Sequence, residues 1–307
     1  MGISERNFLG KAQILNLNAK LSERETNYTA GFSEPFFLDR DVYASINLFN
    51  NKHDYKESNY VLKREGFSFA TSFNLSEYFN QSVSYSLQER VVEPEVGASA
   101  SIFAEKGETS ISQVSSSLTY NTLDNNQNPS EGLRISGGSS LAGIGGDKKL
   151  LNLFNEGDYY KPYNDKLFIL NLGYDFGFVT GLGEDVLISD RYFLGGNSFR
   201  GFSQSGLGPR DTITGDSLGG NFYYTGSVKG TFGLGLPPEL GLRGNMFTTF
   251  GTLTGIDKTT VTYNDDSAIR LSAGVGISWT SPFGPISVIL SQAILKKDYD
   301  KTETVSF

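Results

Sequence analysis

Apolar and polar residues alternate with a period of two along most of this chain. Between residues 168 and 178 the even positions are all large and apolar, whereas the odd positions are mostly polar or small. Residues 270–279 repeat the pattern, with Arg270 and Ser272 on the polar face and Leu271 and Trp279 on the apolar face. Strict alternation is typical of a β-strand with two different faces. The pattern therefore predicts an all-β protein in which one face of the sheet is apolar and the other polar.

The alternating segments are about ten residues long, which is enough for a tilted strand to cross a bilayer. A soluble β-sandwich has shorter strands, and its core face is rarely lined with Ser and Gly. We expect these apolar side chains to face lipid: Phe168, Leu170, Leu172, Tyr174, Phe176 and Phe178, with Asn171 and Asp175 facing the barrel lumen. The predicted strands are 2–10, 12–22, 26–37, 41–51, 58–74, 80–91, 110–123, 132–142, 150–162, 166–179, 220–232, 239–253, 267–281, 284–293 and 299–307.

The connections between these strands alternate between tight turns and longer polar segments. Residues 39–41 and 282–285 form short turns, whereas 92–109, 180–219 and 254–266 form long loops. Short periplasmic turns and long outer loops are the pattern of outer-membrane barrels. We find no internal repeat and no second domain, so residues 1–307 are interpreted as one transmembrane antiparallel β-barrel domain.

The composition supports a membrane barrel. Apolar residues make up only 38% of the chain, yet it contains 36 Gly, 23 Phe and 16 Tyr. Such a balance fits a polar lumen and an apolar outer face with aromatic girdles at both interfaces. No run approaches the ~18 apolar residues that a transmembrane helix needs. The net charge of −8 and the absence of a basic patch argue against nucleic-acid binding.

Other chemistries have little support in the sequence. The chain has no cysteine, and its one histidine, His53, lies in a polar stretch where a solvated loop residue is the natural interpretation. Residues 124–128 resemble a calcium loop only faintly, because the Gly and terminal Glu of an EF-hand are missing. Residues 143–149 lack the Gly-Lys-Ser/Thr of a phosphate-binding loop. We therefore expect no enzyme activity, no metal and no cofactor.

The segment 190–211 is the most informative part of the chain. It is rich in glycine, and it holds Arg200 between aromatic residues within a loop of about forty residues, a length that is usually either functional or disordered. Its aromatic content argues against disorder. The segment resembles the signature loop of the BamA-type outer-membrane insertases, in which an Arg-Gly-Phe tripeptide on a long extracellular loop folds into the barrel lumen. The candidate functional residues in this loop are Gly195, Gly196, Ser198, Phe199, Arg200, Gly201, Phe202, Gly208 and Pro209.

Several further segments carry the same resemblance in the same order. They are residues 2–11, 32–40, 118–124, 218–221, 237–244 and 281–285. The resemblance implies a sixteen-strand insertase barrel that periplasmic repeat domains precede in family members. On this basis we expect the chain to begin inside the second strand and to stop inside the last one, without the repeat domains. Phe307 could alternatively be the terminal aromatic residue that closes family barrels.

The resemblance also implies a function. Family barrels act through a weak seam between the first and last strands, where an unfolded client strand adds by β-augmentation. The expected partners are the outer-membrane bilayer, unfolded client β-barrel proteins and, for a full-length member, assembly lipoproteins. The expected location is the bacterial outer membrane. Two alternatives stay open: a protein-translocating pore of two-partner secretion, and a passive porin, against which the loop carrying Arg200 argues.

The resemblance finally places two residues near Arg200. Family members carry acidic groups at positions that correspond to Lys229 and Thr249, and both residues are expected to face the lumen. Lys229 would repel Arg200, so Asp175, Asp211 and the carbonyls of the loop are the other candidate partners. Gly195, Gly196 and Gly201 are expected to need positive φ or a close approach of the backbone. Phe199 and Phe202 are expected to pack against the lumen wall.

Overall fold

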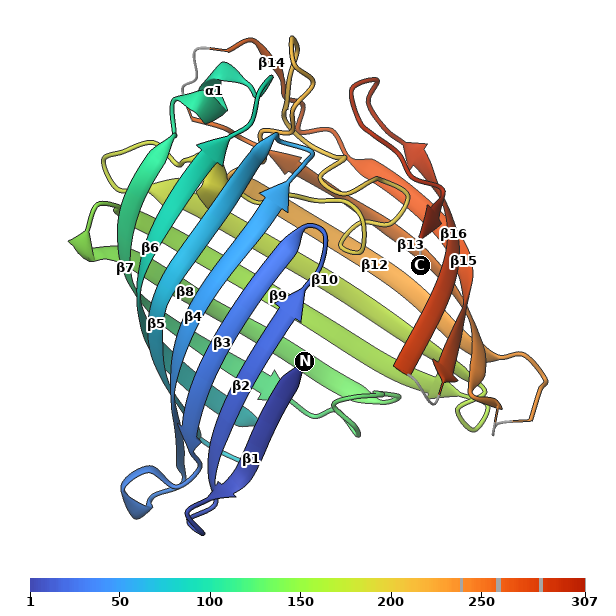
Figure 1. Cartoon of the computed structure of the whole chain (residues 1–307). Coiled ribbons are helices and arrows are strands. Elements are labelled where there is room, and N and C mark those ends of the chain that lie inside the picture. The colour runs from blue at the N-terminus through green and yellow to red at the C-terminus, as the bar shows by residue number, and fades with distance from the viewer. Residues whose placement is uncertain (238–239, 258–260, 282–283, 307) are drawn as a thin grey trace.

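The chain folds into one large antiparallel sheet that curls around a long internal loop (Figure 1). The computed structural model describes residues 1–237, 240–257, 261–281 and 284–306. The strands of the large sheet are β1 (Gly2–Phe8), β2 (Gln13–Leu21), β3 (Glu25–Glu34), β4 (Val42–Tyr55), β5 (Tyr60–Asn74), β6 (Phe79–Pro94), β7 (Gly107–Asn121), β8 (Gly132–Gly146), β9 (Leu150–Tyr163), β10 (Phe168–Gly181), β12 (Phe222–Gly233), β13 (Leu242–Thr254), β15 (Arg270–Ser281), β16 (Gly284–Leu295) and β17 (Val305–Ser306). Each strand pairs with the next one along the chain, as expected of a meander.

The remaining elements are short and lie in the connections. They are η1 (Phe37–Asp39), α1 (Ala100–Phe103), η2 (Ile188–Asp190) and a small separate sheet of β11 (Arg210–Asp211) and β14 (Tyr263–Asn264). Within the described ranges, none of the helices has the length and apolar character needed to cross a membrane.

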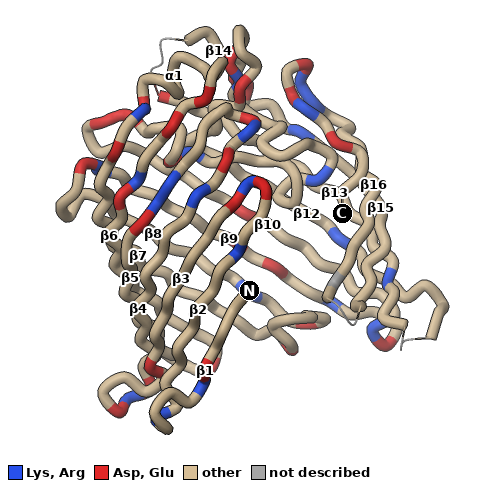
Figure 2. Tube along the Cα trace, in the orientation of Figure 1, with Lys and Arg blue, Asp and Glu red and all other residues tan. Residues whose placement is uncertain are grey.

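The two faces of the large sheet differ in the way that the alternation predicts. On β10, Leu172 and Tyr174 are 41% and 42% exposed on the outer face, whereas Ile169 and Val179 are buried. On β15, Val275 and Ile277 are also exposed. The buried residues of β15 are instead the polar Arg270, Ser272 and Ser281. Figure 2 shows that most charged residues lie near the ends of the strands and in the connections, so the middle of most strands carries few charges. An apolar band between charged rims is typical of a membrane barrel.

The predicted strands agree with the structure in number and order, and most boundaries lie within a few residues. The prediction for 299–307 is wrong in its extent. Only Val305–Ser306 pairs with β16, and Thr302 instead forms an isolated bridge with Phe202 of the long loop. The backbone N–H groups of Lys301 and Glu303 and the carbonyl of Lys301 find their partners on that loop, so these groups cannot extend the hairpin. The predicted turn at 282–285 lies partly outside the described residues. Residue 239, at the start of the predicted strand 239–253, and residue 307, at the end of 299–307, also lie outside them.

The outward orientation of Leu172 gives a direct test of the fold. We expect Leu172→Arg to destabilise the folded barrel by about 2–4 kcal/mol if the position lies near the bilayer midplane, because a charge on the lipid face must leave water. The measurement is urea unfolding in lipid vesicles. Spin labels at positions 172 and 173 provide the control, since one should meet membrane-dissolved oxygen and the other an aqueous reagent. Equal access at both positions would contradict the assignment of faces.

Candidate functional site: the internal loop and its attachments

The connection between β10 and β12, residues 182–221, is called here the internal loop. It packs against the inner face of the sheet through three buried apolar clusters. The first joins loop residues Ile188 and Leu218 to β5, β6 and α1, and the third joins Val186 to β7, β8, β9 and β10. The second contains the tip of the loop. Most of the apolar core of this protein therefore lies between the internal loop and the wall.

The tip of the internal loop is fixed by aromatic packing and by glycine. Phe199 and Phe202 are fully buried, lie edge to face at 5.2 Å between ring centroids, and contact Tyr223 and Leu253 of the wall. The prediction that both rings pack against the wall is confirmed. Gly195, Gly196 and Gly201 have φ of 136°, 56° and 95°, as expected. A Cβ on Gly201 would also lie 2.9 Å from the Cβ of Ser272, so a larger residue would push the tip off the wall.

The other predicted loop residues shape the backbone around the tip. The Ser198 hydroxyl donates to the carbonyl of Gly195 at 2.9 Å and closes a small turn. Gly208 has φ of 107° and lies against Leu253, and the N–H of Leu218 donates to the carbonyl of Pro209 at 2.9 Å. These contacts give the loop a defined conformation.

Arg200 has none of the partners that we expected. Its guanidinium lies over the ring of Phe247 at 5.8 Å, and its Nε is buried without a hydrogen-bond partner among the described residues. Asp175 instead accepts from the Tyr223 hydroxyl at 2.8 Å. Asp211 accepts from the Ser99 hydroxyl at 2.5 Å and from the backbone of its own turn. Both carboxylates are engaged elsewhere, so their assignment as partners of Arg200 is wrong.

Lys229 and Thr249 lie where the resemblance placed them, on the inner face. Thr249 is buried. On the opposite face, Val228, which precedes Lys229, is 46% exposed, and Phe250, which follows Thr249, is 42% exposed. Lys229 pairs in register with Phe247, whose ring carries the Arg200 guanidinium. The structure therefore brings two cations together beside one aromatic ring. Their effect on loop docking stays a prediction.

A buried ion pair fastens the middle of the internal loop to β6. Arg90 donates to both carboxylate oxygens of Asp190. The Nη1–Oδ1 distance is 2.5 Å, and the Nη2–Oδ2 distance is 2.9 Å. The side chains are 3% and 11% exposed. Arg191, the next residue, donates to the carbonyls of Val186 and Leu218 and so ties the two ends of the loop together. Bidentate contacts of this kind fix geometry as well as charge.

The outer end of the internal loop is fastened to two neighbouring hairpins. Asp216 accepts from the backbone N–H of Ser99 at 2.7 Å and from the side chain of Asn59 at 2.5 Å. The Ser58 hydroxyl donates to the carbonyl of Ser217 at 2.8 Å. The β4–β5 turn and the segment before α1 thus both bind residues 216–217 of the internal loop.

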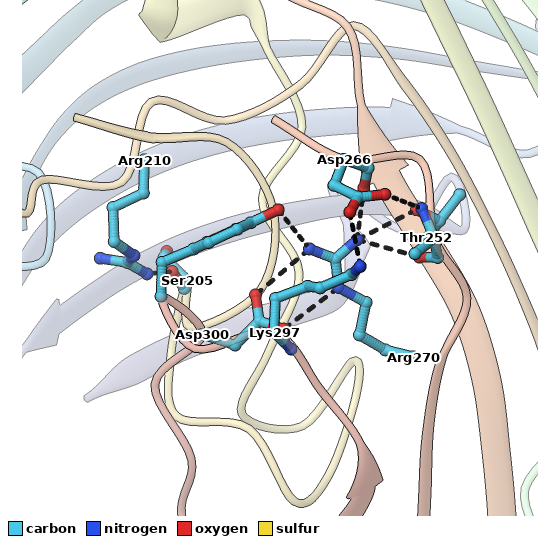
Figure 3. A network of polar contacts seen from close by, with 9 residues as sticks. Ser205, Arg210, Thr252, Asp266, Arg270, Lys297 and Asp300 are labelled. Atoms are coloured by element: carbon cyan, nitrogen blue, oxygen red, sulfur yellow. Dashed lines mark hydrogen bonds and ion pairs between the residues drawn. The ribbon is translucent and has the colours of Figure 1, made fainter. Parts of the chain in front are cut away.

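A third polar network lies at the start of β15 (Figure 3). Arg270 is fully buried and donates to Asp300 at 3.1 Å, to the Tyr299 hydroxyl at 3.0 Å and to the carbonyls of Asp266 and Ala268. The Asp300 side chain is 0% exposed. Nearby, Arg210 donates to the carbonyl of Ser205 on the internal loop at 2.9 Å. The network joins the wall to the connection between β16 and β17.

Sequence reasoning missed Arg90, Asp190, Asp216, Arg270 and Asp300. One signal was present for Arg270, because it shares the inner face of an alternating strand with small residues, where an unpaired charge is costly. The acidic partners lie 100 and 30 residues away from their arginines, and no local pattern connects them. As for metals, the part of the chain that the structure describes holds no group of three or more metal-ligating side chains.

Glu105 gives the loop attachment a dependence on pH. Its Oε1 accepts from the N–H of Ile188 at 2.7 Å, while Oε2 is buried without a partner among the described residues. Burial raises the pKa of Glu105 from 4.5 to about 7. Because the folded state favours the protonated form, the stabilisation is fully present below pH 4.5 and is lost as the pH rises through about 7.

We therefore expect the internal loop to resist trypsin better at pH 5.5 than at pH 8, after correction for the activity of the protease, because this window spans the raised pKa of Glu105. Glu105→Gln stays neutral and keeps an oxygen acceptor for Ile188. It should remove most of this dependence and protect the loop at pH 8. An unchanged pH profile in Glu105→Gln would assign the effect to another group.

Comparison with known proteins agrees with this architecture. Residues 7–307 match the family model of the Omp85 superfamily domain. The chain is 34% identical over 307 residues to the outer membrane protein assembly factor BamA of Neorickettsia risticii, covering 99% of this chain but 41% of that protein. The chain thus spans about two fifths of the length of this curated relative.

Solved structures give the same fold. The crystal structure of BamA from Haemophilus ducreyi lacking POTRA domains 1–3 superposes with a TM-score of 0.88 at 20% identity, covering 99% of this chain and 65% of that one. CdiB from Acinetobacter baumannii superposes with a TM-score of 0.64 at 14% identity, covering 99% and 54%. The fifteen-stranded sheet is thus a β-barrel of the BamA type, and the chain belongs to the Omp85 superfamily.

Proposed function

We propose that this chain is the barrel part of an outer-membrane protein assembly factor, which folds client β-barrel proteins into the bacterial outer membrane. The similar protein of N. risticii carries that name. The observation that carries the proposal is the internal loop itself. Its Arg-Gly-Phe tip is docked on the inner wall and paired with the segment that leads into the last strand. This arrangement supports the proposal, because the signature loop pairs with the approach to a strand at which a client could join.

The mechanism that we propose uses strand pairing rather than covalent chemistry. In lipid, each unpaired backbone N–H or C=O costs several kcal/mol, so a client strand gains by pairing with an exposed strand edge. The barrel would supply that edge at the seam between the first and last strands of the whole barrel. The driving force is the client's own hydrogen bonding and burial. No nucleophile or nucleotide is required, and periplasmic lipoproteins would assist by delivering clients.

Two alternatives make different predictions. CdiB from A. baumannii shares the fold, so a protein-conducting pore is the second candidate. A passive porin is the third, but a porin constriction sets an acidic loop against basic clusters. Here the tip of the loop carries a positive charge instead of an acidic group. Arg200 lies over Phe247, the register partner of Lys229.

Reconstitution distinguishes these candidates. The protein, expressed from its whole reading frame, is placed in liposomes with an unfolded outer-membrane barrel, and assembly is followed as the heat-sensitive shift of the folded client on a gel. We expect assembly to be faster than in empty liposomes, with little leakage of a small dye. Dye leakage without assembly would favour a porin, and passage of an unfolded polypeptide into the vesicles would favour a secretion pore. Either result would overturn the proposal.

A further inference from the structure

The connection between β16 and β17, residues 296–304, is called here the C-terminal connection. It pairs with the internal loop much as a strand does. The N–H of Ser203 donates to the carbonyl of Lys301 at 3.0 Å, and the N–H of Lys301 donates to the carbonyl of Gly206 at 2.8 Å. A third bond, from Glu303 N–H to Gly201 carbonyl at 3.2 Å, extends the pairing. The tip of the loop and the approach to the last strand are therefore hydrogen-bonded to each other over several residues.

The same connection is fastened to the wall from its other side. Arg270 donates from Nε to Asp300 and from Nη2 to the Tyr299 hydroxyl (Figure 3). Its Nη1 donates to the carbonyls of Asp266 and Ala268. A second pair, Lys297–Asp266 at 2.5 Å, lies beside it. Arg270 is fully buried, and loss of Asp300 would leave its charge without its carboxylate partner. Such a loss is strongly destabilising at a buried site. The position of the connection is therefore set by Arg270.

β17 follows this connection directly. The N–H of Ser291 donates to the carbonyl of Thr304 at 2.8 Å, and the next residue pairs with β16 as Leu290↔Val305. Any movement of residues 300–304 must therefore shift the place where β17 meets β16. The internal loop lies on one side of these residues and Arg270 on the other.

We propose that the tip of the internal loop, residues 195–206, and the terminal strand β17 form one cooperative unit, with Arg270 and Asp300 as the positioning residues that hold it together. Undocking of the tip then weakens the pairing of β17 with β16, and displacement of β17 releases the tip. The coupling itself follows from contacts within this chain. Its use in client assembly rests on the proposed function: a client that engages the terminal strand would also undock the Arg-Gly-Phe tip.

Reciprocity gives the test, because a coupling free energy acts equally in both directions. The chain has no cysteine, so introduced cysteines report without interference. Leu290→Cys with Val305→Cys places two outward-facing residues opposite each other, and the yield of their disulfide reports the pairing of β17. Trypsin cleavage after Arg200 or Arg210 reports loop docking.

Two substitutions test the coupling, one in the internal loop and one in the C-terminal connection. Gly206→Ala acts on the loop, because a Cβ there would lie 2.3 Å from the carbonyl oxygen of Lys301. We expect it to lower the 290–305 disulfide yield by about fivefold or more, the low end of coupling between sites in proteins. Asp300→Asn acts on the connection and should raise the rate of trypsin cleavage in the loop by a similar factor. If Gly206→Ala does not fold, Ser203→Pro serves instead, since it removes the N–H that binds Lys301.

Asp190→Asn is the matched control. It weakens another buried Arg–Asp pair, which holds the middle of the internal loop on β6 and makes no contact with the tip or the C-terminal connection among the described residues. Its disulfide yield should stay within twofold of the parent. The proposal is overturned if Gly206→Ala opens the loop yet leaves the disulfide yield unchanged, or if Asp190→Asn lowers the yield as much. The liposome assay separates the two claims: intact coupling without client assembly would refute the proposed function but not the cooperative unit.

Discussion

Arg90→Met should release the middle of the internal loop from β6, at a cost of about 3–5 kcal/mol in docking free energy. The methionine keeps an apolar stem of similar length, but it leaves Asp190 without the two donors that now hold its oxygens at 2.5 and 2.9 Å. Asp190 is 11% exposed and cannot recover that loss from water without moving. The loop must therefore either keep an unpaired buried charge or open.

Trypsin cleavage after Arg191 measures this opening, because Arg191 follows Asp190 directly. When opening and closing are fast, the cleavage rate follows the population of the open form. A cost of about 3 kcal/mol corresponds to a cleavage rate at least about a hundredfold higher. Arg134→Met is the matched control. Its ion pair with Glu156 is 3.6 Å long between side chains that are 47% and 46% exposed, so it should change the rate by little. Similar rates in the two variants would mean that the Arg90–Asp190 pair does not hold the loop.

The strands of this protein were predictable because the inner and outer faces impose a local rule. Along most of β15, successive side chains point alternately to the exposed apolar face and to the inner polar face, and the sequence shows the same alternation. The terminal strand escaped the rule for a physical reason. The backbone groups of Lys301 and the N–H of Glu303 are bound by the internal loop, and a pattern of side chains carries no record of which backbone a segment pairs with.

Only those features of the site that depend on residues close together in the sequence could be predicted. The tip glycines and the rings of Phe199 and Phe202 follow from the backbone and volume needs of a tight buried turn, and the structure agrees. The partners of the arginines do not follow. Arg200 was expected beside a carboxylate or a carbonyl of the loop but lies over Phe247, while Arg90 and Arg270, for which the sequence predicted no partner, hold buried carboxylates. Pairing across 100 residues depends on how the loop folds back, which is a property of the whole barrel.

Lys229→Glu combined with Thr249→Asp should dock the tip of the internal loop more tightly. Arg200 now meets Phe247 on the wall, with Lys229 paired in register to that same ring, and its Nε lacks an acceptor among the described residues. Replacing the lysine removes a repulsion and supplies an acceptor, and a hydrogen bond to a charged group contributes about 1.5–3 kcal/mol. The inner position strengthens both effects, because the dielectric constant there is lower than in water. We expect trypsin cleavage after Arg210 to slow by about tenfold or more.

A double-mutant cycle decides whether Arg200 is the cause. In an Arg200→Gln background, Lys229→Glu with Thr249→Asp should give little or no protection, since the cation that gains the acceptor is gone. Lys229→Gln in the parent background separates the two contributions: it removes the repulsion but adds no carboxylate, so its protection should be intermediate. Equal protection with and without Arg200 would mean that the new carboxylates act on another part of the wall. The guanidinium would then owe its position to the face of Phe247 alone, and the tighter docking would come from a contact that does not involve Arg200.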